Sequence, residues 1–530
     1  MATTGEILVS TVQRLLKEAG LPTELVGHLK SSSNRVIGSG PVIPSSFAIG
    51  AMAQATVAAS ALAAVHFLRA RGGPAQDVSV DERHAVLEFL SQAWFLVDGK
   101  PPSGAWDSIA GAYQTKDEGY VRIHTNFPHH RQGILDLLYH ISHAAPSSTT
   151  RQSVQSSILS TNLSSFEFEQ IATNRGLCVA ALRSFEEWDE TPQGRALKGV
   201  PAVNVIRIGD GLRERQNSKR DKSVPKRPLE GIRVLELTRV LAGPVAGRTL
   251  AAHGADVLWI TSPNLPDLPI VDRDTSRGKR TTQLDLTQPQ DREKLEELIK
   301  ETDVFLQSYR PEALEAKGFG PQRLMEIKPG IIIANLRAYG WDGPWRDRRG
   351  FDSLVQTATG FNVAEAESYN QSPSVEEGDS PLRLRPFPVQ CLDHAAGQLL
   401  TLGIISALDK TWKEGGSYEV RVSLAGTGNL LRSLPRLPPE IGFGPYAQPI
   451  SEATSQEIQD LSYTVASTLE SGDTAAGTAE TPGSPGSKGR KMTALRHAAV
   501  LSETPVRLGI SPGGLDVHQP VWLPRGKSDD

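Results

Sequence analysis

Cysteine is nearly absent from this chain of 530 residues, which contains only Cys178 and Cys391. Two cysteines can build neither a disulfide framework nor a cysteine-rich metal site, and such low usage is typical of a reducing compartment. An excess of charge of one sign is also lacking, because 56 Lys and Arg stand against 60 Asp and Glu. This balance argues against nucleic acid or an anionic membrane as the main partner.

Recognisable targeting signals are missing as well. The start, MATTGEILVSTVQRLLKEAG, is polar and is typical of an amphipathic helix rather than a secretory signal. The last residues, GKSDD, match no peroxisomal or ER-retention signal. We therefore expect a cytoplasmic protein.

One long apolar stretch, Phe47–Leu68 (FAIGAMAQATVAASALAAVHFL), raises the question of a membrane span. Nine of its residues are Ala, and Gln54, Ser60 and His66 interrupt it. Alanine gains little from lipid, whereas alanine-rich helices pack closely inside proteins. The stretch predicts a buried helix and no membrane association.

The overall composition is that of a globular protein with generous loops, since 38% of the residues are hydrophobic, 22% are charged, and Gly and Pro number 48 and 36.

Two polar segments interrupt the chain. Residues 216–228 (QNSKRDKSVPKRP) carry charge without apolar periodicity and predict a solvated linker. Residues 471–491 (SGDTAAGTAETPGSPGSKGRK) cannot bury enough apolar surface to offset chain entropy, so they predict a disordered linker.

The second half opens with short apolar runs that alternate with helical patterns. Strands are predicted at 232–237, 255–260, 304–306 and 330–336, and helices at Val245–His253 and from about Pro311. This order predicts a doubly wound parallel sheet with helices on both faces. Ligands of such sheets bind at the carboxyl ends of the strands, so the turn at Val240–Gly243 is a candidate site. It lacks G-x-G-x-x-G, which disfavours dinucleotide binding.

The chain also resembles itself. Phe47–Val80 and Asp393–Ser423 each contain a long helix of small residues, a basic turn with Gly-Gly, and a short strand. The pattern suggests that residues 1–215 and 226–530 are related, incomplete halves.

Several stretches of the second half resemble the family III CoA-transferases (the CaiB/BaiF family), which also contain α-methylacyl-CoA racemases. They are PLEGIRVLELTRVLAGPVAGRTLAAHGADVLWI, RGKRTTQLDL, DVFLQSYRPEALEAKGFG, IIIANLRAYGWDGPWRDRRGFDSLVQTATG and PVQCLDHAAGQLLTLGIISAL, in the family's order between Pro228 and Leu424. Gly111–Ile123 and Phe185–Ile208 resemble the family's smaller domain, and Met492–Gly509 its closing segment.

The resemblance implies an α/β fold with a doubly wound, Rossmann-like parallel sheet and a second, smaller α+β domain. Residues 1–215 would be a partial family copy that supplies the smaller domain and lacks the nucleophile. Residues 229–450 would form the catalytic CoA-binding domain, and residues 492–530 the closing segment. Subunits of the family interlock as dimers, so a chain with both half-copies is expected to be a monomer, with a homodimer as the alternative.

Asp393 matches the family's nucleophilic aspartate, which precedes a Gly (here Gly397) and a long helix of small residues. A carboxylate can attack an acyl-CoA thioester to give a mixed anhydride and then an aspartyl-CoA, from which a second carboxylic acid takes the CoA. No metal or prosthetic group is required, and the partners are an acyl-CoA and a carboxylic acid. The alternative is that Asp393 only caps the helix that follows it. The corresponding place in the first half, Gly50 and Ala51, has no carboxylate.

The CoA-contacting stretches implied by the resemblance are Val240, Leu241 and Ala242; Leu284, Asp285, Leu286 and Thr287; Ser308, Tyr309 and Arg310; and Arg349, Gly350, Phe351 and Asp352. Arg310 and Arg349 are the charged candidates for the phosphates of CoA, although a solvated surface role is the commoner fate of a single arginine. His140 and His143 could share a helix face as metal ligands, but surface or core histidines explain their spacing more simply.

Two positions distinguish branches of the family. Racemases carry His where Phe351 stands, and phenylalanine cannot transfer a proton, so CoA transfer is favoured over racemisation of 2-methylacyl-CoA esters. Formyl-CoA transferases carry Gln where Leu241 stands, which makes formate and oxalate poor substrate candidates. A relative that binds CoA esters without turnover stays open as a third hypothesis.

Overall fold

The structure, a computed structural model, describes residues 4–31, 40–101, 106–142, 150–211, 224–376, 380–467, 490–507, 510 and 512–525. The predicted linker at 216–228 and the predicted disordered linker at 471–491 therefore lie mostly outside the described residues. The exceptions are residues 224–228 and the first two residues of a strand, β15, which begins at Arg490.

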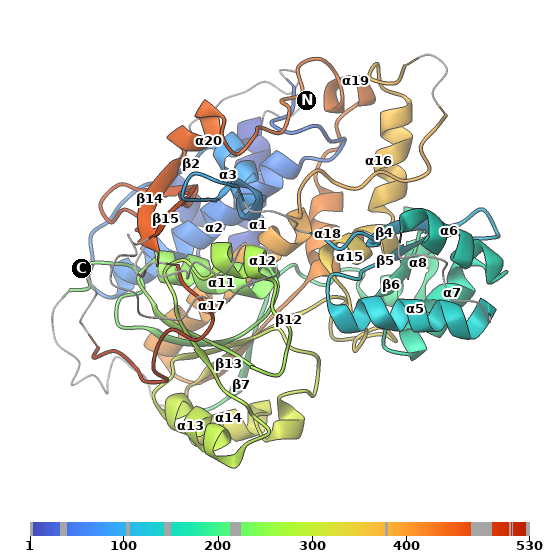
Figure 1. Ribbon diagram of the computed structural model, residues 1–530. Helices are drawn as coiled ribbons and strands as arrows, with labels where there is room; N and C mark the ends of the chain where they lie inside the picture. The colour runs from blue at the N-terminus through green and yellow to red at the C-terminus, as the bar shows by residue number, and fades with distance from the viewer. Residues whose placement is uncertain are drawn as a thin grey trace.

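A seven-stranded sheet in the order β10-β9-β8-β11-β12-β13-β7 forms the centre of the larger lobe (Figure 1). Its strands are β7 (Asn204–Gly209), β8 (Arg233–Leu237), β9 (Asp256–Thr261), β10 (Arg280–Gln283), β11 (Val304–Gln307), β12 (Ile332–Arg337) and β13 (Ser417–Ser423). All neighbours run parallel except β7, which pairs antiparallel with β13. The predicted doubly wound parallel sheet is confirmed.

Helices cover both faces of this sheet, so its strands are buried on both sides. Val234 packs in one apolar cluster with residues of α11 (Ala242–Ala252) and α17 (Cys391–Glu414). Leu235, the next residue of β8, packs in another with residues of α13 (Pro289–Lys300) and α14 (Pro321–Ile327). Alternate side chains of a strand point to opposite faces, so a strand covered twice has a continuous apolar sequence.

The smaller lobe is built from residues of the first half and lies at the right of Figure 1. Its three-stranded antiparallel sheet has the order β4-β5-β6. The elements are β4 (Gly111–Gln114), β5 (Tyr120–Ile123), β6 (Val179–Ala181), α5 (Pro128–Ser142), α6 (Arg151–Ser160) and α7 (Ser165–Asn174). They share an apolar cluster of their own, which confirms the predicted smaller α+β domain. The chain then passes through α8 (Phe185–Glu190) and α9 (Pro192–Ala196) to strand β7 of the large sheet.

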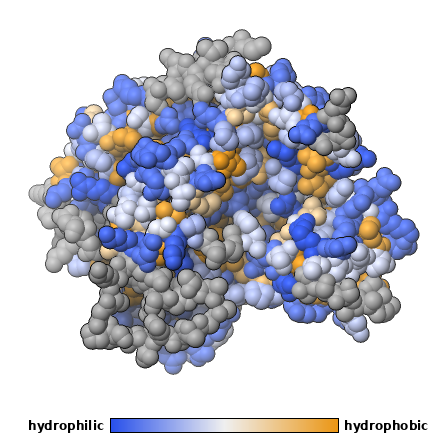
Figure 2. Space-filling view, turned by 45° about the horizontal axis from the view of Figure 1, so that its top comes forward, coloured by the Kyte–Doolittle hydropathy of each residue, from blue (hydrophilic) through white to orange (hydrophobic). Residues whose placement is uncertain are grey.

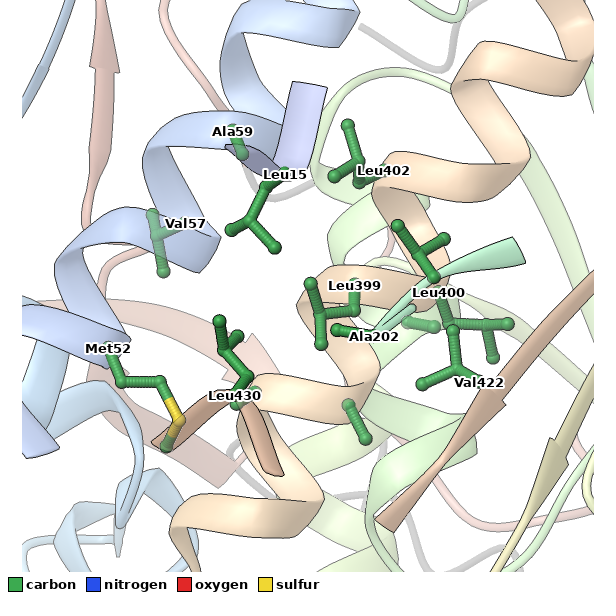
Figure 3. Packing of buried hydrophobic residues seen from close by; sticks show 14 of the residues in the cluster. Leu15, Met52, Val57, Ala59, Ala202, Leu399, Leu400, Leu402, Val422 and Leu430 are labelled. Carbon is green, nitrogen blue, oxygen red and sulfur yellow. The ribbon is translucent and has the colours of Figure 1, made fainter. Parts of the chain in front are cut away.

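The N-terminal helices pack into the core of the larger lobe. Helices α1 (Thr4–Ala19) and α2 (Ile49–Ala70) share one apolar cluster with α17, in which Leu15, Met52 and Leu399 lie together (Figure 3). A buried hydrogen bond of 2.9 Å also joins Ser60 Oγ of α2 to Gln398 Oε1 of α17. Helices α2 and α17 are long and apolar enough to cross a membrane. However, 94% of the most apolar 18-residue stretch of α2 and 100% of that of α17 are buried inside the protein. The prediction of a buried helix at Phe47–Leu68 is confirmed.

Two further sheets join chain segments from both ends. Their orders are β1-β2-β16 and β14-β15-β3. The strands are β1 (Leu29–Ser31), β2 (Val78–Val80), β3 (Leu96–Val97), β14 (Ser462–Ser467), β15 (Arg490–Leu495) and β16 (Ala499–Leu501). The chain also forms the helices α3 (Glu82–Glu88), α4 (Ser91–Trp94), α12 (Pro269–Thr275), α15 (Asp352–Ala358), α16 (Phe361–Asn370), α18 (Leu424–Ser433), α19 (Pro439–Gly442) and α20 (Gln456–Asp460).

Two predicted helix boundaries are corrected. No helix begins at Pro311: the chain turns there and forms a short 3₁₀ helix at Glu315–Lys317, and the next α-helix, α14, begins at Pro321. Helix α11 begins at Ala242, before Pro244 rather than after it. Proline is tolerated there because the N–H groups of a first helical turn have no intrahelical acceptor.

Candidate active site

Helix α17 places Asp393 in its first turn, and Asp352 holds the start of this helix. The helix begins at Cys391, and its N-cap residue Gln390 makes no side-chain cap. The carboxylate of Asp352 instead accepts hydrogen bonds from the backbone N–H groups of Leu392 (2.8 Å) and Asp393 (3.0 Å). The alternative that Asp393 itself caps the helix is therefore wrong. Among the described residues, no hydrogen bond engages its carboxyl group.

A glycine one turn further along α17 brings this helix close to α11. A Cβ atom at Gly397 would lie 2.8 Å from the carbonyl oxygen of Ala242 and 2.7 Å from Cγ1 of Val245. Residues four apart share a helix face, so Asp393 lies on the side of α17 that meets the start of α11. Gly397 thus allows the close approach that places the carboxyl group beside the turn after β8.

The turn after β8 has a strained backbone that buried polar contacts hold in place. Val240 has φ +69°, a left-handed conformation that is unfavourable for a β-branched residue. Beneath it, the buried Lys279 donates to Glu236 Oε1 and to the carbonyl of Pro244, each at 2.8 Å. Thr238 Oγ1 donates to the same carboxylate oxygen at 2.6 Å. These contacts fix both ends of the turn at the carboxyl edge of the sheet.

A cleft of about 200 Å³ lies between the two lobes, and Asp393 forms part of its wall. Figure 2 shows the surface recessed between the lobe at the right and the main body. The smaller lobe contributes Phe127, His129, His130 and Cys178. The larger lobe contributes the turn after β8, the ends of β11 and β12, and the segment before α15, namely Arg239–Gly243, Ser308–Pro311, Leu336–Ala338, Arg346–Phe351 and Leu424. One chain therefore supplies both walls.

Unpaired arginines give the cleft a positive character. Arg239, Arg310, Arg337 and Arg349 all line it, and no carboxylate pairs with any of them among the residues that the structure describes. Arg349 donates to the carbonyl of Gly176, and Arg239 donates to the carbonyl of Pro266. Burial and the neighbouring Arg349 lower the pKa of Arg310. Unpaired guanidinium groups in a concave site are suited to binding phosphate or carboxylate groups.

Burial dominates the titration of the two aspartates. Asp393 is 7% exposed, and its pKa is raised well above the ordinary value by burial and by the nearby charge of Asp352. The pKa of Asp352 is also raised by burial, although its hydrogen bonds from the backbone of Asp393 and from Gln356 oppose this shift. A carboxyl group whose pKa is raised in this way holds its proton until a higher pH than a free aspartate does.

Two histidines of the smaller lobe, His124 and His130, have strongly lowered pKa values. Burial, together with nearby His129 and Arg349, lowers the pKa of His130 to about 3. Burial and Arg122 likewise lower the pKa of His124 to about 3. The ring of His124 stacks on Phe351 with 3.7 Å between centroids, so Phe351 stands between this imidazole and the cleft. Burial raises the pKa of Cys178 to about 11, which keeps its thiol protonated.

Most of the predicted site residues lie together. Val240, Leu241, Ala242, Ser308, Tyr309, Arg310, Arg349, Gly350, Phe351 and Asp393 all line the cleft. Asp352 lies beneath it, 1% exposed. Leu284, Asp285, Leu286 and Thr287 do not line the cleft; they follow β10, which lies two strands from β8 at the same edge of the sheet. The sequence interpretation missed Phe127, His129, His130, Cys178, Arg239 and Arg348.

Among the described residues, no group of three His, Cys, Asp or Glu side chains is arranged to hold a metal ion; His143, one of the two predicted ligands, lies outside them. Cys391 is fully buried, and burial raises its pKa well above the ordinary thiol value.

The fold and the site together define an α/β protein with an arginine-lined cleft that has a buried aspartate in its wall. Residues 229–433 match the model of CoA-transferase family III. Over these residues, the chain is similar to CoA-transferase family III, the CaiB/BaiF family.

Similar proteins carry related names. The chain is 33% identical over 271 residues to an acyl-CoA transferase of Gibberella moniliformis, covering 49% of this chain and 45% of that protein. It is 32% identical over 215 residues to a probable fatty acyl-CoA transferase of Mycobacterium tuberculosis, covering 38% and 52%. A crystal structure of a CaiB/BaiF family protein from Brucella suis matches at 25% identity with a TM-score of 0.33, over 39% of this chain and 56% of that one. The chain thus spans about half the length of these relatives.

Proposed function

We propose that this protein transfers CoA from an acyl-CoA thioester to a carboxylic acid, with Asp393 as the nucleophile. The observation that carries the proposal is the position of Asp393 in the wall of a cleft lined by four arginines that have no carboxylate partner among the described residues. The match of residues 229–433 to CoA-transferase family III, and relatives named as acyl-CoA transferases, support it.

The proposed reaction needs no cofactor. The carboxylate of Asp393 attacks the thioester carbonyl, the carbon–sulfur bond breaks, and CoA leaves as its thiolate while a mixed anhydride forms. The thiolate then attacks the aspartyl carbonyl, which releases the first acid and leaves an aspartyl-CoA thioester. The carboxylate of the acceptor acid attacks this thioester and forms a second anhydride with release of the thiolate. The thiolate finally attacks the acceptor's carbonyl, which yields the new acyl-CoA and the free Asp393.

The walls of the cleft are suited to these steps. Helix α11 begins at Ala242, and the N–H groups of its first turn have no intrahelical acceptor, so they are available to an oxyanion or a phosphate. Arg310 and Arg349, which line the cleft, would bind the phosphates of CoA or the acceptor carboxylate. Phe127, Phe351 and Leu424 provide an apolar surface for an acyl group. Leu284–Thr287, at the same edge of the sheet, are expected to contact a more distant part of CoA.

Racemisation of a 2-methylacyl-CoA is disfavoured by the same geometry. Taking a proton from one face of the α-carbon and returning it to the other requires two opposed acid–base groups. Phe351 cannot supply one, and it shields His124 from the cleft. His130 does line the cleft, but with a pKa of about 3 it is a poor base near neutral pH.

A transfer assay tests the proposal directly. The protein is incubated with an acyl-CoA and an unrelated carboxylic acid, and the new acyl-CoA is detected by mass spectrometry. We expect product to depend on both substrates and to vanish in Asp393→Asn. Asp210→Asn, which changes an exposed carboxylate outside the cleft, serves as the matched control and should retain activity. Equal turnover by Asp393→Asn and the wild type would overturn the proposal.

A further inference from the structure

A second cavity of about 710 Å³ lies away from the catalytic cleft and is larger than it. The last turns of α11, helix α3 and strands β14 and β16 enclose it with the loops beside β15. Helix α11 connects the two sites, because Ala242 lines the cleft whereas Arg248 and Ala252 line the cavity. The proposed CoA transfer does not use this space.

Basic side chains outnumber acidic ones in the wall of this cavity. Among the described residues, four arginines line it, against one acid, Glu88. Glu88 is already satisfied, since it accepts hydrogen bonds from His497 Nδ1 and from the backbone N–H of Ala498, both at 2.9 Å. These contacts and Arg248 hold the pKa of Glu88 well below its usual range. Arg496 and Arg507 have no carboxylate partner among the described residues, so the cavity has an excess of positive charge.

Two buried nitrogen atoms in this wall lack a hydrogen-bond partner. The side chain of Arg248 is 5% exposed and that of His497 is 7% exposed. Arg248 Nη1 donates to Asp274 and Ser91, but its Nη2 atom makes no hydrogen bond within the described part of the chain and lies 3.5 Å from Glu88 Oε1. His497 Nε2 also has no partner there. Buried polar groups are normally paired, so an oxygen atom of an anionic ligand would complete Arg248 Nη2, and another would complete His497 Nε2 when the ring carries a proton on both nitrogens.

The rest of the wall is apolar. Leu461, Val465, Ala499, Pro505 and Val506 all line the cavity. A cavity of several hundred Å³ with apolar walls and a few convergent polar groups is typical of a small-molecule site. Its occupant must therefore carry both an anionic head and an apolar body.

We propose that this cavity binds an aliphatic carboxylic acid, with the carboxylate at Arg248 and His497 and the alkyl chain along Leu461, Val465 and Val506. This would be a second carboxylate site, separate from the one in which Asp393 reacts. It stands independently of the proposed transferase activity, because none of its residues lines the catalytic cleft.

Isothermal titration of the full-length protein tests the site with three probes. Octanoate carries both the head and the tail, acetate lacks the tail, and octan-1-ol lacks the charge. We expect octanoate to bind at least tenfold more tightly than either of the others. Failure of octanoate to bind, or equal affinity for octan-1-ol, would overturn the proposal.

Matched variants separate this cavity from the cleft. Val500→Trp adds bulk at the rim of the cavity, where Val500 is 57% exposed, so the fold should tolerate it. Val521→Trp makes the same change at a similarly exposed valine outside the cavity. We expect Val500→Trp to weaken octanoate binding at least tenfold, with Val521→Trp and the cleft variant Arg349→Gln unchanged. Loss of binding in Arg349→Gln with retention in Val500→Trp would place octanoate in the cleft and refute the second site.

Discussion

The backbone N–H of Asp393 donates to the carboxylate of Asp352 at 3.0 Å, so the proposed nucleophile is held in place by a second buried carboxyl group. The same neighbour raises the pKa of Asp393 through its charge, in addition to the effect of burial. Asp352 thus contributes to both the position and the protonation of the proposed nucleophile. The effect on position and the effect on protonation can each be tested by substituting one of the two aspartates.

The pH dependence of the reaction should respond to Asp352. A carboxyl nucleophile must be ionised, and the pKa of Asp393 is raised, so kcat/KM should increase with pH through that pKa. In Asp352→Asn the nearby charge is lost while an oxygen remains to accept from the helix N–H groups. We expect the rise in kcat/KM to move to lower pH, with a severalfold gain in relative activity at pH 6 over the wild type. An unchanged profile would show that Asp352 does not control the ionisation.

The stability of the protein should report the buried carboxyl group of Asp393. A raised pKa in the folded state means that stability is lost as pH rises from about 4, the value for an unfolded aspartate, to the folded pKa. Within this window the loss is about 1.4 kcal/mol per pH unit. Asp393→Asn has no such loss, so we expect it to have the higher Tm at pH 7 and a Tm close to that of the wild type at pH 4. A lower Tm for Asp393→Asn at pH 7 would contradict the raised pKa.

The parts of the fold that could be predicted from sequence are those with a local signal. The strands of the large sheet are continuous apolar runs because helices cover both faces, and the turn at Val240–Gly243 follows one of them directly. The role of Asp352 could not be predicted, because it depends on contacts with a helix 41 residues away in the chain. The stretch HTNFPHH supplies Phe127 and His130 to the wall of the cleft, but histidine spacing alone cannot show which lobe faces which.

The same limit applies to the charged groups. Arg310 and Arg349 were candidates only through family resemblance, and Arg239 carried no signal that separated it from other arginines. Their convergence depends on three different loops that meet at the carboxyl edge of the sheet. Residues 284–287 were also implied by the family resemblance. They lie at the same edge of the sheet but outside the cleft.

Arg349 should contribute to binding of the acyl-CoA. Its guanidinium lines the cleft without a carboxylate partner among the described residues, so its loss removes a charge-assisted contact. We expect Arg349→Gln to raise KM for the acyl-CoA about tenfold, equivalent to about 1.4 kcal/mol, with a smaller effect on kcat. Steady-state kinetics measure both constants.

The control for this prediction is Arg323→Gln on α14. Arg323 is half exposed and pairs with Glu296, away from the cleft, and exposed pairs of this kind contribute little. Its KM should match that of the wild type. Equal KM values for Arg349→Gln and the wild type would remove Arg349 from the binding surface.

The protein should be active as a monomer. Both walls of the cleft come from one chain, with His130 from the smaller lobe and Asp393 from the larger. We expect light scattering during gel filtration to give a mass near 57.2 kDa for the fraction that carries transferase activity. Activity confined to a dimer fraction would show that a second copy completes the site.

The most direct test of the account is to trap the activated carbonyl of Asp393. The protein is incubated with a panel of acyl-CoAs and then with hydroxylamine, which converts an aspartyl anhydride or thioester to a hydroxamate but leaves a free carboxylate unchanged. Peptide mass spectrometry should find the hydroxamate on Asp393, and only when an acyl-CoA is present. A panel member that supports CoA transfer while Asp393 stays unmodified would contradict covalent catalysis by this residue.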